Sequence, residues 1–336
     1  MGKFAPYART ANEVIFKRLQ VITTYEQSIG KKARQTLGRK LDITTSNHYI
    51  EHELHQRLTH LEATMQSDVI TIVAPMYAGI DDIVRTFTEE IATDGSERNK
   101  DLSVVLETDG GSIEVVERIA DVLRHHYPQG EINFIVPNRA MSAGTVLVMC
   151  GDNIYMDYYS VLGPVDPQVR SQTSGFFVPA LGYLNKYEEL VAKSQAGSLS
   201  AAEMAFMIEK FDPAELDSFE KARDLSTALL VDWLTKYKFK DWTRTEGRGM
   251  PVTDDMKADR AEEIGTKLNS TDRWKSHSRG ISMAVLQRDL NLVVEDFGAD
   301  AQKNDAIGKY HRLLQDYMQR RGKDIVFQNR HTITLL

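Results

Sequence analysis

The stretch that decides the fold contains three short segments, LETDGGS at residues 106–112, NRAMSAGT at 138–145 and SVLGPVDPQ at 160–168. Each segment follows an apolar run, at 102–106, 132–136 and 154–156, and a further run stands at 69–73. Continuous apolar runs of this kind are typical of strands in a parallel sheet that is covered on both faces. Helical patterns separate the runs, so we expect a βαβ series whose working loops lie at strand ends.

The composition indicates a cytoplasmic protein with a sizeable core. The chain has 336 residues, 42% of them hydrophobic. It carries 41 basic and 48 acidic residues, a net charge of −7, with no block of one sign. A nucleic-acid partner is therefore not expected, because its footprint would be basic. The single cysteine, Cys150, cannot form an internal disulfide, which favours a reducing compartment.

No secretory pattern is visible at the N-terminus. The longest apolar stretch, residues 69–80, is too short to cross a bilayer and contains Pro75 and Gly79. We therefore expect no integral membrane segment.

Helical patterns flank the central stretch on both sides. We expect a helical N-terminal extension at 1–66, a core at 67–295, and a C-terminal helix and tail at 296–336. After Asp166 the pattern predicts helices only, at 183–194, 201–210, 214–237, 253–268, 281–290 and 300–321.

The Gly110-Gly111 pair leaves backbone N–H groups unshielded at a strand end. Two such donors can stabilise the oxyanion of a tetrahedral intermediate. Taken alone, the pair is a weak signal and is more typical of a tight strand-to-helix turn. Ser142 precedes a predicted buried helix at 143–150, where the positive end of the helix dipole favours an alkoxide. An isolated serine at this position would be read as a simple N-cap, and the three segments in order favour the catalytic interpretation.

In this order the three segments, together with DNIYM at 152–156, resemble the serine dehydrogenase proteinase family. That family has the Clp/crotonase fold and is related to signal peptide peptidase A. The resemblance implies an α/β fold, a Clp/crotonase-like ββα superhelix with helical additions at both ends. The chain departs from the family at Asp109, where relatives commonly have proline.

The resemblance implies that Ser142 is the nucleophile and that the N–H groups of Gly111 and Ala143 form the oxyanion hole. Gly110, Gly144 and Asp166 would support them. A Clp-type triad would place its histidine near Asp166, and no histidine stands there. Signal-peptide-peptidase relatives use a Ser/Lys dyad instead, which requires a lysine whose pKa is lowered by burial.

The leading candidate for the base is Lys186, 44 residues after Ser142, with Leu184 and Leu190 as an apolar wall. Lys193 and His277 stay open as alternatives. His48, His52 and His55 have a spacing that could bind a metal, but a polar helix face is favoured, so no metal and no other cofactor is expected.

We therefore expect a serine peptidase that is independent of ATP by itself, acts on peptides or proteins and forms a homo-oligomer. Two alternatives stay open. A crotonase-type enzyme would stabilise a thioester enolate in the same oxyanion hole, and a non-catalytic assembly module would keep the fold with Ser142 as a cap.

Overall fold

The computed structural model of the protein describes residues 46–93, 98–165, 168–170, 177–245 and 247–336. The chain divides into two compact units, residues 1–52 and 53–336. Of the first unit, the described part is the beginning of helix α2, which spans Ser46–Met65. Residues 1–45 of the expected N-terminal helical extension and the predicted site residue Asp166 lie outside the described residues. The second unit contains the sheet and the candidate site.

A seven-stranded sheet forms the centre of the second unit, in the order β10-β5-β3-β2-β1-β11-β12. Its strands in chain order are β1 (Asp68–Val73), β2 (Leu102–Glu107), β3 (Ile132–Ile135), β5 (Asn153–Met156), β10 (Glu295–Asp296), β11 (Val326–Gln328) and β12 (Ile333–Leu335). β1, β2, β3, β5 and β10 pair in parallel, whereas β11 and β12 are antiparallel. The α/β class is confirmed, and the sheet is mixed because the C-terminal hairpin adds to its β1 edge.

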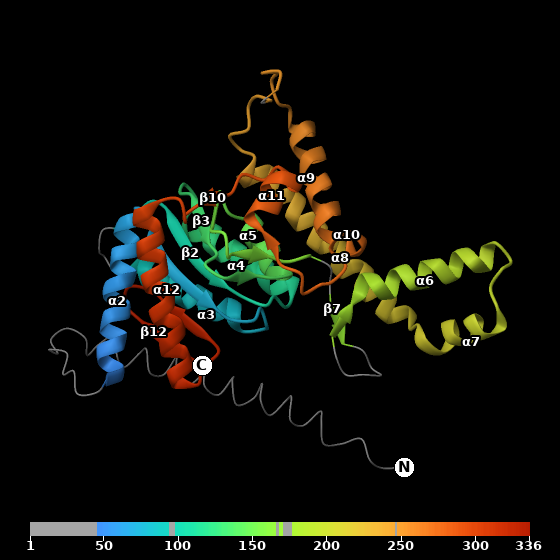
Figure 1. Cartoon of the computed structure of the whole chain (residues 1–336), viewed down its shortest axis with the longest axis horizontal. Helices are drawn as coiled ribbons and strands as arrows, with labels where there is room; N and C mark the ends of the chain where they lie inside the picture. Colours follow the sequence, from blue (N-terminus) through green and yellow to red (C-terminus); the bar gives the residue numbers. More distant parts are fainter. Residues whose placement is uncertain (1–45, 94–97, 166–167, 171–176, 246) are drawn as a thin grey trace, which may run out of the picture. The chain divides into compact units, whose positions relative to one another are not determined.

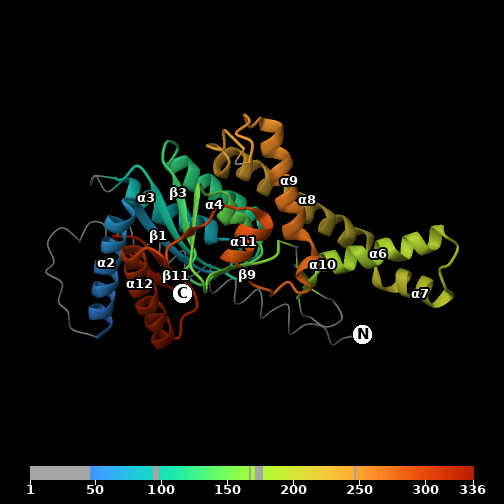
Figure 2. The ribbon, with the colours of Figure 1, turned by 45° about the horizontal axis from the view of Figure 1, so that its top comes forward.

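Helices cover both faces of the sheet, which explains why every residue of β1, β2 and β3 is buried. On one face, Phe87 of α3 (Ile80–Thr93) packs against Phe327 of β11, and α4 (Ile113–His126) lies beside α3. On the other face, Tyr310 of α12 (Ala301–Arg321) hydrogen-bonds Thr71 of β1. Figures 1 and 2 show α12 running alongside α2, where Arg57 donates to the carbonyl of Lys309.

A small three-stranded sheet continues from the carboxyl edge of the central sheet. It consists of β4 (Arg139–Ala140), β6 (Val161–Leu162) and β9 (Ile281–Ser282), in that order. The prediction of one helix over 281–290 is wrong at its start, because residues 281 and 282 pair with β6 and helix α11 spans Met283–Leu290. A C-terminal segment thus reaches the candidate site.

The prediction that the chain is only helical after Asp166 is wrong. β7 (Gln168–Arg170) and β8 (Phe177–Pro179) form a hairpin, and four further short strands follow, β9 to β12. The helices between them are α6 (Ala180–Gln195), α7 (Ala201–Lys210), α8 (Pro213–Trp233), α9 (Asp254–Asn269) and α10 (Thr271–Trp274), with a π-helical turn η1 at Leu234–Lys238. Each missed strand has two or three residues, too few for a periodic signal.

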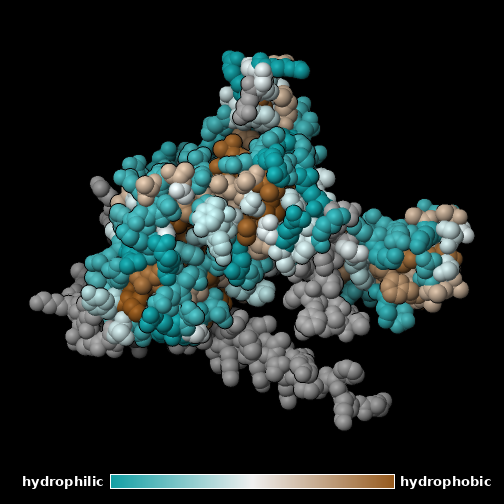
Figure 3. Space-filling view, viewed as in Figure 1, coloured by the Kyte–Doolittle hydropathy of each residue, from teal (hydrophilic) through white to brown (hydrophobic). Residues whose placement is uncertain are grey.

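Helices α6 and α7 form a hairpin whose outer helix is apolar and exposed. Seven of the ten residues of α7 are Ala, Met, Phe or Ile, yet the helix has no buried residue. Met204 is 50% exposed, Phe206 44% and Ile208 78%. Figure 3 shows the corresponding apolar surface over this hairpin. Such a helix is normally covered by another surface. In the described part of the chain, no helix is long and apolar enough to cross a bilayer.

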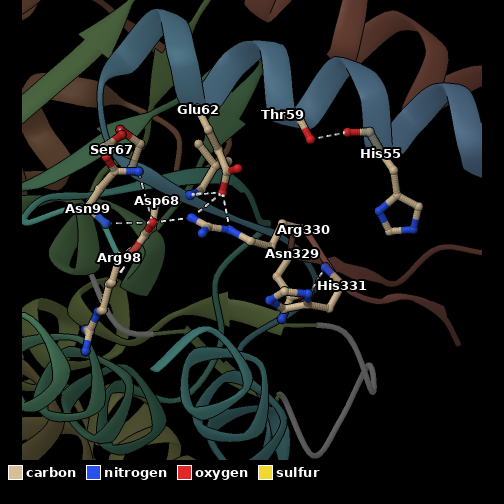
Figure 4. Close-up of polar contacts among 12 residues, drawn as sticks. His55, Thr59, Glu62, Ser67, Asp68, Arg98, Asn99, Asn329, Arg330 and His331 are labelled. Atoms are coloured by element: carbon tan, nitrogen blue, oxygen red, sulfur yellow. Dashed lines mark hydrogen bonds and ion pairs between the residues drawn. The ribbon is translucent and has the colours of Figure 1, made fainter. Parts of the chain in front are cut away.

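A buried ion cluster holds the C-terminal hairpin on the sheet (Figure 4). Arg330, in the turn between β11 and β12, contacts Glu62 of α2 at 3.0 Å and also Asp68, the first residue of β1. Asp68 is fully buried and accepts a further hydrogen bond from Tyr127 at 2.8 Å. Because buried charges need partners, this cluster fixes the position of the hairpin.

Candidate active site

Backbone hydrogen bonds join the Gly-Gly loop to the serine turn at the carboxyl edge of the sheet. Thr108 follows β2; its N–H donates to the Arg139 carbonyl at 3.0 Å, and its carbonyl accepts from Met141 N–H at 3.0 Å. A parallel bridge between Thr108 and Ala140 extends this pairing. The two segments that the sequence singles out therefore lie side by side.

Both glycines of the loop are required by close backbone approach. At Gly110, with φ +94°, an added Cβ would stand 2.8 Å from the Met141 carbonyl oxygen and from Ser142 Cβ. At Gly111 it would stand 2.3 Å from the carbonyl oxygen of Met76, which accepts a 2.8 Å bond from Ser112 N–H. A side chain at Gly110 would push the loop away from Ser142, and a side chain at Gly111 would push it away from Met76.

Ser142 occupies a strained turn directly before helix α5 (Ala143–Met149). Its backbone lies at φ 53° and ψ −121°, a region that non-glycine residues rarely adopt. Its side chain makes no capping hydrogen bond, although the residue stands at the N-cap position. The hydroxyl of this half-buried serine is thus not used by the helix. Strain of this kind costs of order 1–3 kcal/mol and clusters at functional sites.

Helix α5 is buried along its whole length and anchors the turn. Gly144 lies against Thr108, because an added Cβ would stand 2.2 Å from Thr108 Cγ2. The buried hydroxyl of Thr145 accepts from Gly163 N–H at 2.9 Å and lies 2.9 Å from the Ala140 carbonyl, to which it can donate. This hydroxyl ties the third sequence segment to the serine turn.

In the described part of the chain, two N–H groups at this place take part in no backbone hydrogen bond of a loop or turn. Among the described residues, no backbone hydrogen bond outside regular helices and strands uses the N–H of Gly111 or of Ala143. Ala143 is the first residue of α5, where N–H groups have no partner inside the helix. These are the two donors that the family resemblance implies for an oxyanion hole.

A network of charged side chains that was not predicted from the sequence connects the Gly-Gly loop to the serine turn. Arg139 donates to Asp109 through Nε at 2.5 Å and through Nη2 at 3.3 Å, and to Glu107 through Nη1 at 3.3 Å. The hydrogen bond to Asp109 raises the pKa of Arg139. The other oxygen of buried Glu107 contacts His311 and Gln315 of α12, both at 2.9 Å. This network depends on the packing of α12, for which the local sequence holds no signal.

The structure places the two candidate lysines on the exposed surface of α6. Lys186 pairs with Glu189 at 2.8 Å, and its side chain is 47% exposed. Lys193 pairs with Glu189 at 3.0 Å and with Glu203 at 2.9 Å. The hydrogen bond to Glu203 raises the pKa of Lys193, the opposite of what a base requires. The apolar wall expected around Lys186 is therefore not seen here, since Leu184 and Leu190 are buried while the amine is exposed.

His277 precedes strand β9, which pairs with β6 in the small sheet. It is half-buried and stands four residues before Ile281, which pairs with Leu162 in the small sheet. At about 3.3 Å per residue, four residues span at most about 13 Å. His277 therefore stays an alternative to the lysines.

A lysine with a lowered pKa does exist, but at the opposite edge of the sheet. Burial lowers the pKa of Lys238 to about 8. Its amine donates at 3.1 Å to the carbonyl of Asp152, which precedes β5, whereas Ser142 follows the carboxyl end of β3. The two strands are parallel, so a low pKa alone does not identify the base here.

Comparison with known proteins finds a protein family that part of this chain matches. Residues 48–193 match the sequence profile of the ClpP-like SDH-type serine proteinases. The SDH-type resemblance is thus confirmed for this segment. The SDH-type segment includes both glycines of the loop, Ser142 and the two candidate lysines, and it ends before α7.

Two uncharacterized proteins of Methanocaldococcus jannaschii are also similar to the chain. One is 36% identical over 96 residues, which is 28% of this chain and 33% of the relative. The other is 33% identical over 89 residues, which is 26% of this chain and 29% of the relative. The matches thus span about a third of the length of these curated relatives.

Solved structures of the 1510-N membrane-bound stomatin-specific protease are similar at low identity. Two variants, one in complex with a substrate peptide, align with TM-scores of 0.41 and 0.40 at 12% identity each. The alignments cover 70% and 68% of this chain and 83% and 75% of the solved chains.

Proposed function

We propose that the chain is a serine peptidase that hydrolyses peptide bonds through an acyl-enzyme on Ser142. The observation that carries the proposal is the strained Ser142 turn, whose hydroxyl caps nothing and whose Cβ lies against Gly110. The match of residues 48–193 to SDH-type serine proteinases supports the same chemistry.

In the proposed reaction, Ser142 Oγ attacks the scissile carbonyl carbon while its proton passes to a base. The negative charge that develops on the carbonyl oxygen is stabilised by the N–H groups of Gly111 and Ala143. The C–N bond then breaks, the leaving amine takes the proton from the base, and water hydrolyses the ester. Gly110 and Gly144 support the geometry because no side chain at either position would fit.

The proposed base is Lys186. Its support is its position in the SDH-type segment, 44 residues after Ser142 and on the helix that follows β8. Its amine pairs with Glu189 at 2.8 Å, so the proposal requires that this ion pair breaks and that the amine is neutral before it accepts the serine proton.

We further propose that the chain forms a homo-oligomer through α7. The support is that α7 consists mainly of apolar residues and that none of them is buried. An exposed apolar surface of this kind is typical of a protein–protein interface.

The proposed function is tested by peptide hydrolysis with matched serine variants. Ser142→Ala should abolish hydrolysis with the fold retained by circular dichroism. Ser282→Ala is the control, because Ser282 also stands at an N-cap without a side-chain bond but has an ordinary φ of −71°. Full activity in purified Ser142→Ala would refute the proposal.

A further inference from the structure

One ion pair bridges the two turns that the proposed mechanism uses. Asp109 directly precedes Gly110, and Arg139 stands three residues before Ser142. Two N–H groups of Arg139 contact the two oxygens of Asp109, at 2.5 and 3.3 Å. A guanidinium bound in this way to both carboxylate oxygens fixes an orientation as well as a distance.

The guanidinium of Arg139 also contacts a second carboxylate, that of the buried Glu107. Arg139 Nη1 contacts Oε1 of Glu107, whose side chain is 8% exposed. Asn138 Nδ2 donates to the same oxygen at 2.7 Å, and α12 supplies His311 and Gln315 to Oε2. Glu107 is therefore fixed on both oxygens, and Arg139 connects this fixed point to the exposed Asp109.

We propose that Arg139 and Asp109 are positioning residues that hold the Gly110-Gly111 loop at its working distance from Ser142. This inference rests on the proposed function. Backbone bonds at Thr108 already join the two segments, but they end before Gly110. The ion pair extends the connection to Asp109, the residue next to Gly110.

Because the Arg139–Asp109 pair is exposed, its effect on the reaction rate can be distinguished from its effect on the free energy of unfolding. Asp109 is 71% exposed and Arg139 41%. Exposed ion pairs contribute little to the free energy of unfolding. Misplacement of reacting groups by about 1 Å, in contrast, can cost up to about a hundredfold in rate. Loss of the pair should therefore slow the reaction much more than it lowers the melting temperature.

The test measures how fast a small fluorophosphonate labels Ser142, alongside kcat, KM and melting temperature. The variants are Asp109→Asn, Arg139→Gln and the double variant, with Arg320→Gln as control for an exposed pair on α12, Arg320–Asp316. We expect each single variant to label about tenfold slower or more, with kcat reduced and KM unchanged. The double variant should be no slower than the slower single variant, because both act through one contact. Arg320→Gln should match wild type.

Three outcomes would overturn the inference. Labelling of Asp109→Asn at the wild-type rate would show that the ion pair does not position the loop. If Arg139→Gln fails to fold, the result for Asp109→Asn alone tests the inference. A raised KM with unchanged labelling shows that Asp109 binds substrate instead. Multiplied losses in the double variant show two separate effects. Failure of the proposed function is distinct, since wild type would then not be labelled at Ser142, and the inference would fall with it.

Discussion

Replacing Arg330 by methionine should destabilise the protein strongly. The substitution keeps much of the side-chain volume but removes the cation that lies between Glu62 and Asp68. The Arg330 side chain is 15% exposed, that of Glu62 10% and that of Asp68 0%, so the remaining carboxylates would stay buried without it. Removing one partner of a buried ion pair costs about 3–5 kcal/mol. At about 1.4 °C per kcal/mol for a chain of this size, the melting temperature should fall by roughly 4–7 °C.

The loss should depend on pH in a defined direction. Burial raises the pKa of Glu62 above its ordinary 4.5, and the charge of Arg330 opposes this shift. Without Arg330 the folded-state pKa should rise further. A raised folded-state pKa means that the neutral acid is favoured in the folded protein, so the contribution is lost as pH rises through that pKa. The difference in unfolding free energy between wild type and Arg330→Met should therefore be larger at pH 7.5 than at pH 5.

The assay is urea denaturation followed by circular dichroism at both pH values. Arg320→Met is the control, because Arg320 and Asp316 form a 2.7 Å pair with side chains 66% and 47% exposed. It should stay within about 0.5 kcal/mol of wild type. A loss below 1 kcal/mol for Arg330→Met at pH 7.5, or an equal loss at both pH values, would refute the reasoning.

The remaining predictions concern the core, the base and the surface. Tyr310→Phe should cost about 1–2 kcal/mol in urea denaturation, because the buried hydroxyl lies 2.6 Å from Thr71 Oγ1 and 3.0 Å from Gln328; an unchanged midpoint would contradict this. Lys186→Met should abolish peptide hydrolysis while Lys193→Met retains it. If Lys186→Met is fully active and His277→Ala is inactive, the base is His277. Ile208→Glu should lower the mass measured by light scattering, and a wild-type chain that is monomeric at micromolar concentration would exclude the oligomer.

The strands around the site could be predicted because runs of consecutive apolar residues indicate strands that are buried on both faces. The run at 102–106 became β2, and the run at 132–136 became β3 with its last residue outside the strand. Ser142 and Gly110 could be expected near each other because both follow neighbouring parallel strands, and such strands share one carboxyl edge.

The parts that could not be predicted depend on long-range packing. β9 and β11 have two or three residues each, and their pairing partners lie more than a hundred residues away in the chain. The contacts of Glu107 with His311 and Gln315 require α12 to cover the end of β2, and no local pattern encodes that. The environment of Lys186 could not be predicted because Leu184 and Leu190 bury their own side chains, whereas the Lys186 side chain extends to Glu189 and stays 47% exposed.

The central claim is that Ser142 is the nucleophile, and active-site labelling tests it most directly. Purified wild-type protein is treated with a fluorophosphonate, digested, and mapped by mass spectrometry. The account predicts one adduct, on Ser142, with hydrolysis lost in proportion to labelling and no adduct in Ser142→Ala. An adduct on a different serine with equal loss of hydrolysis, or hydrolysis that persists after Ser142 is fully labelled, would contradict it.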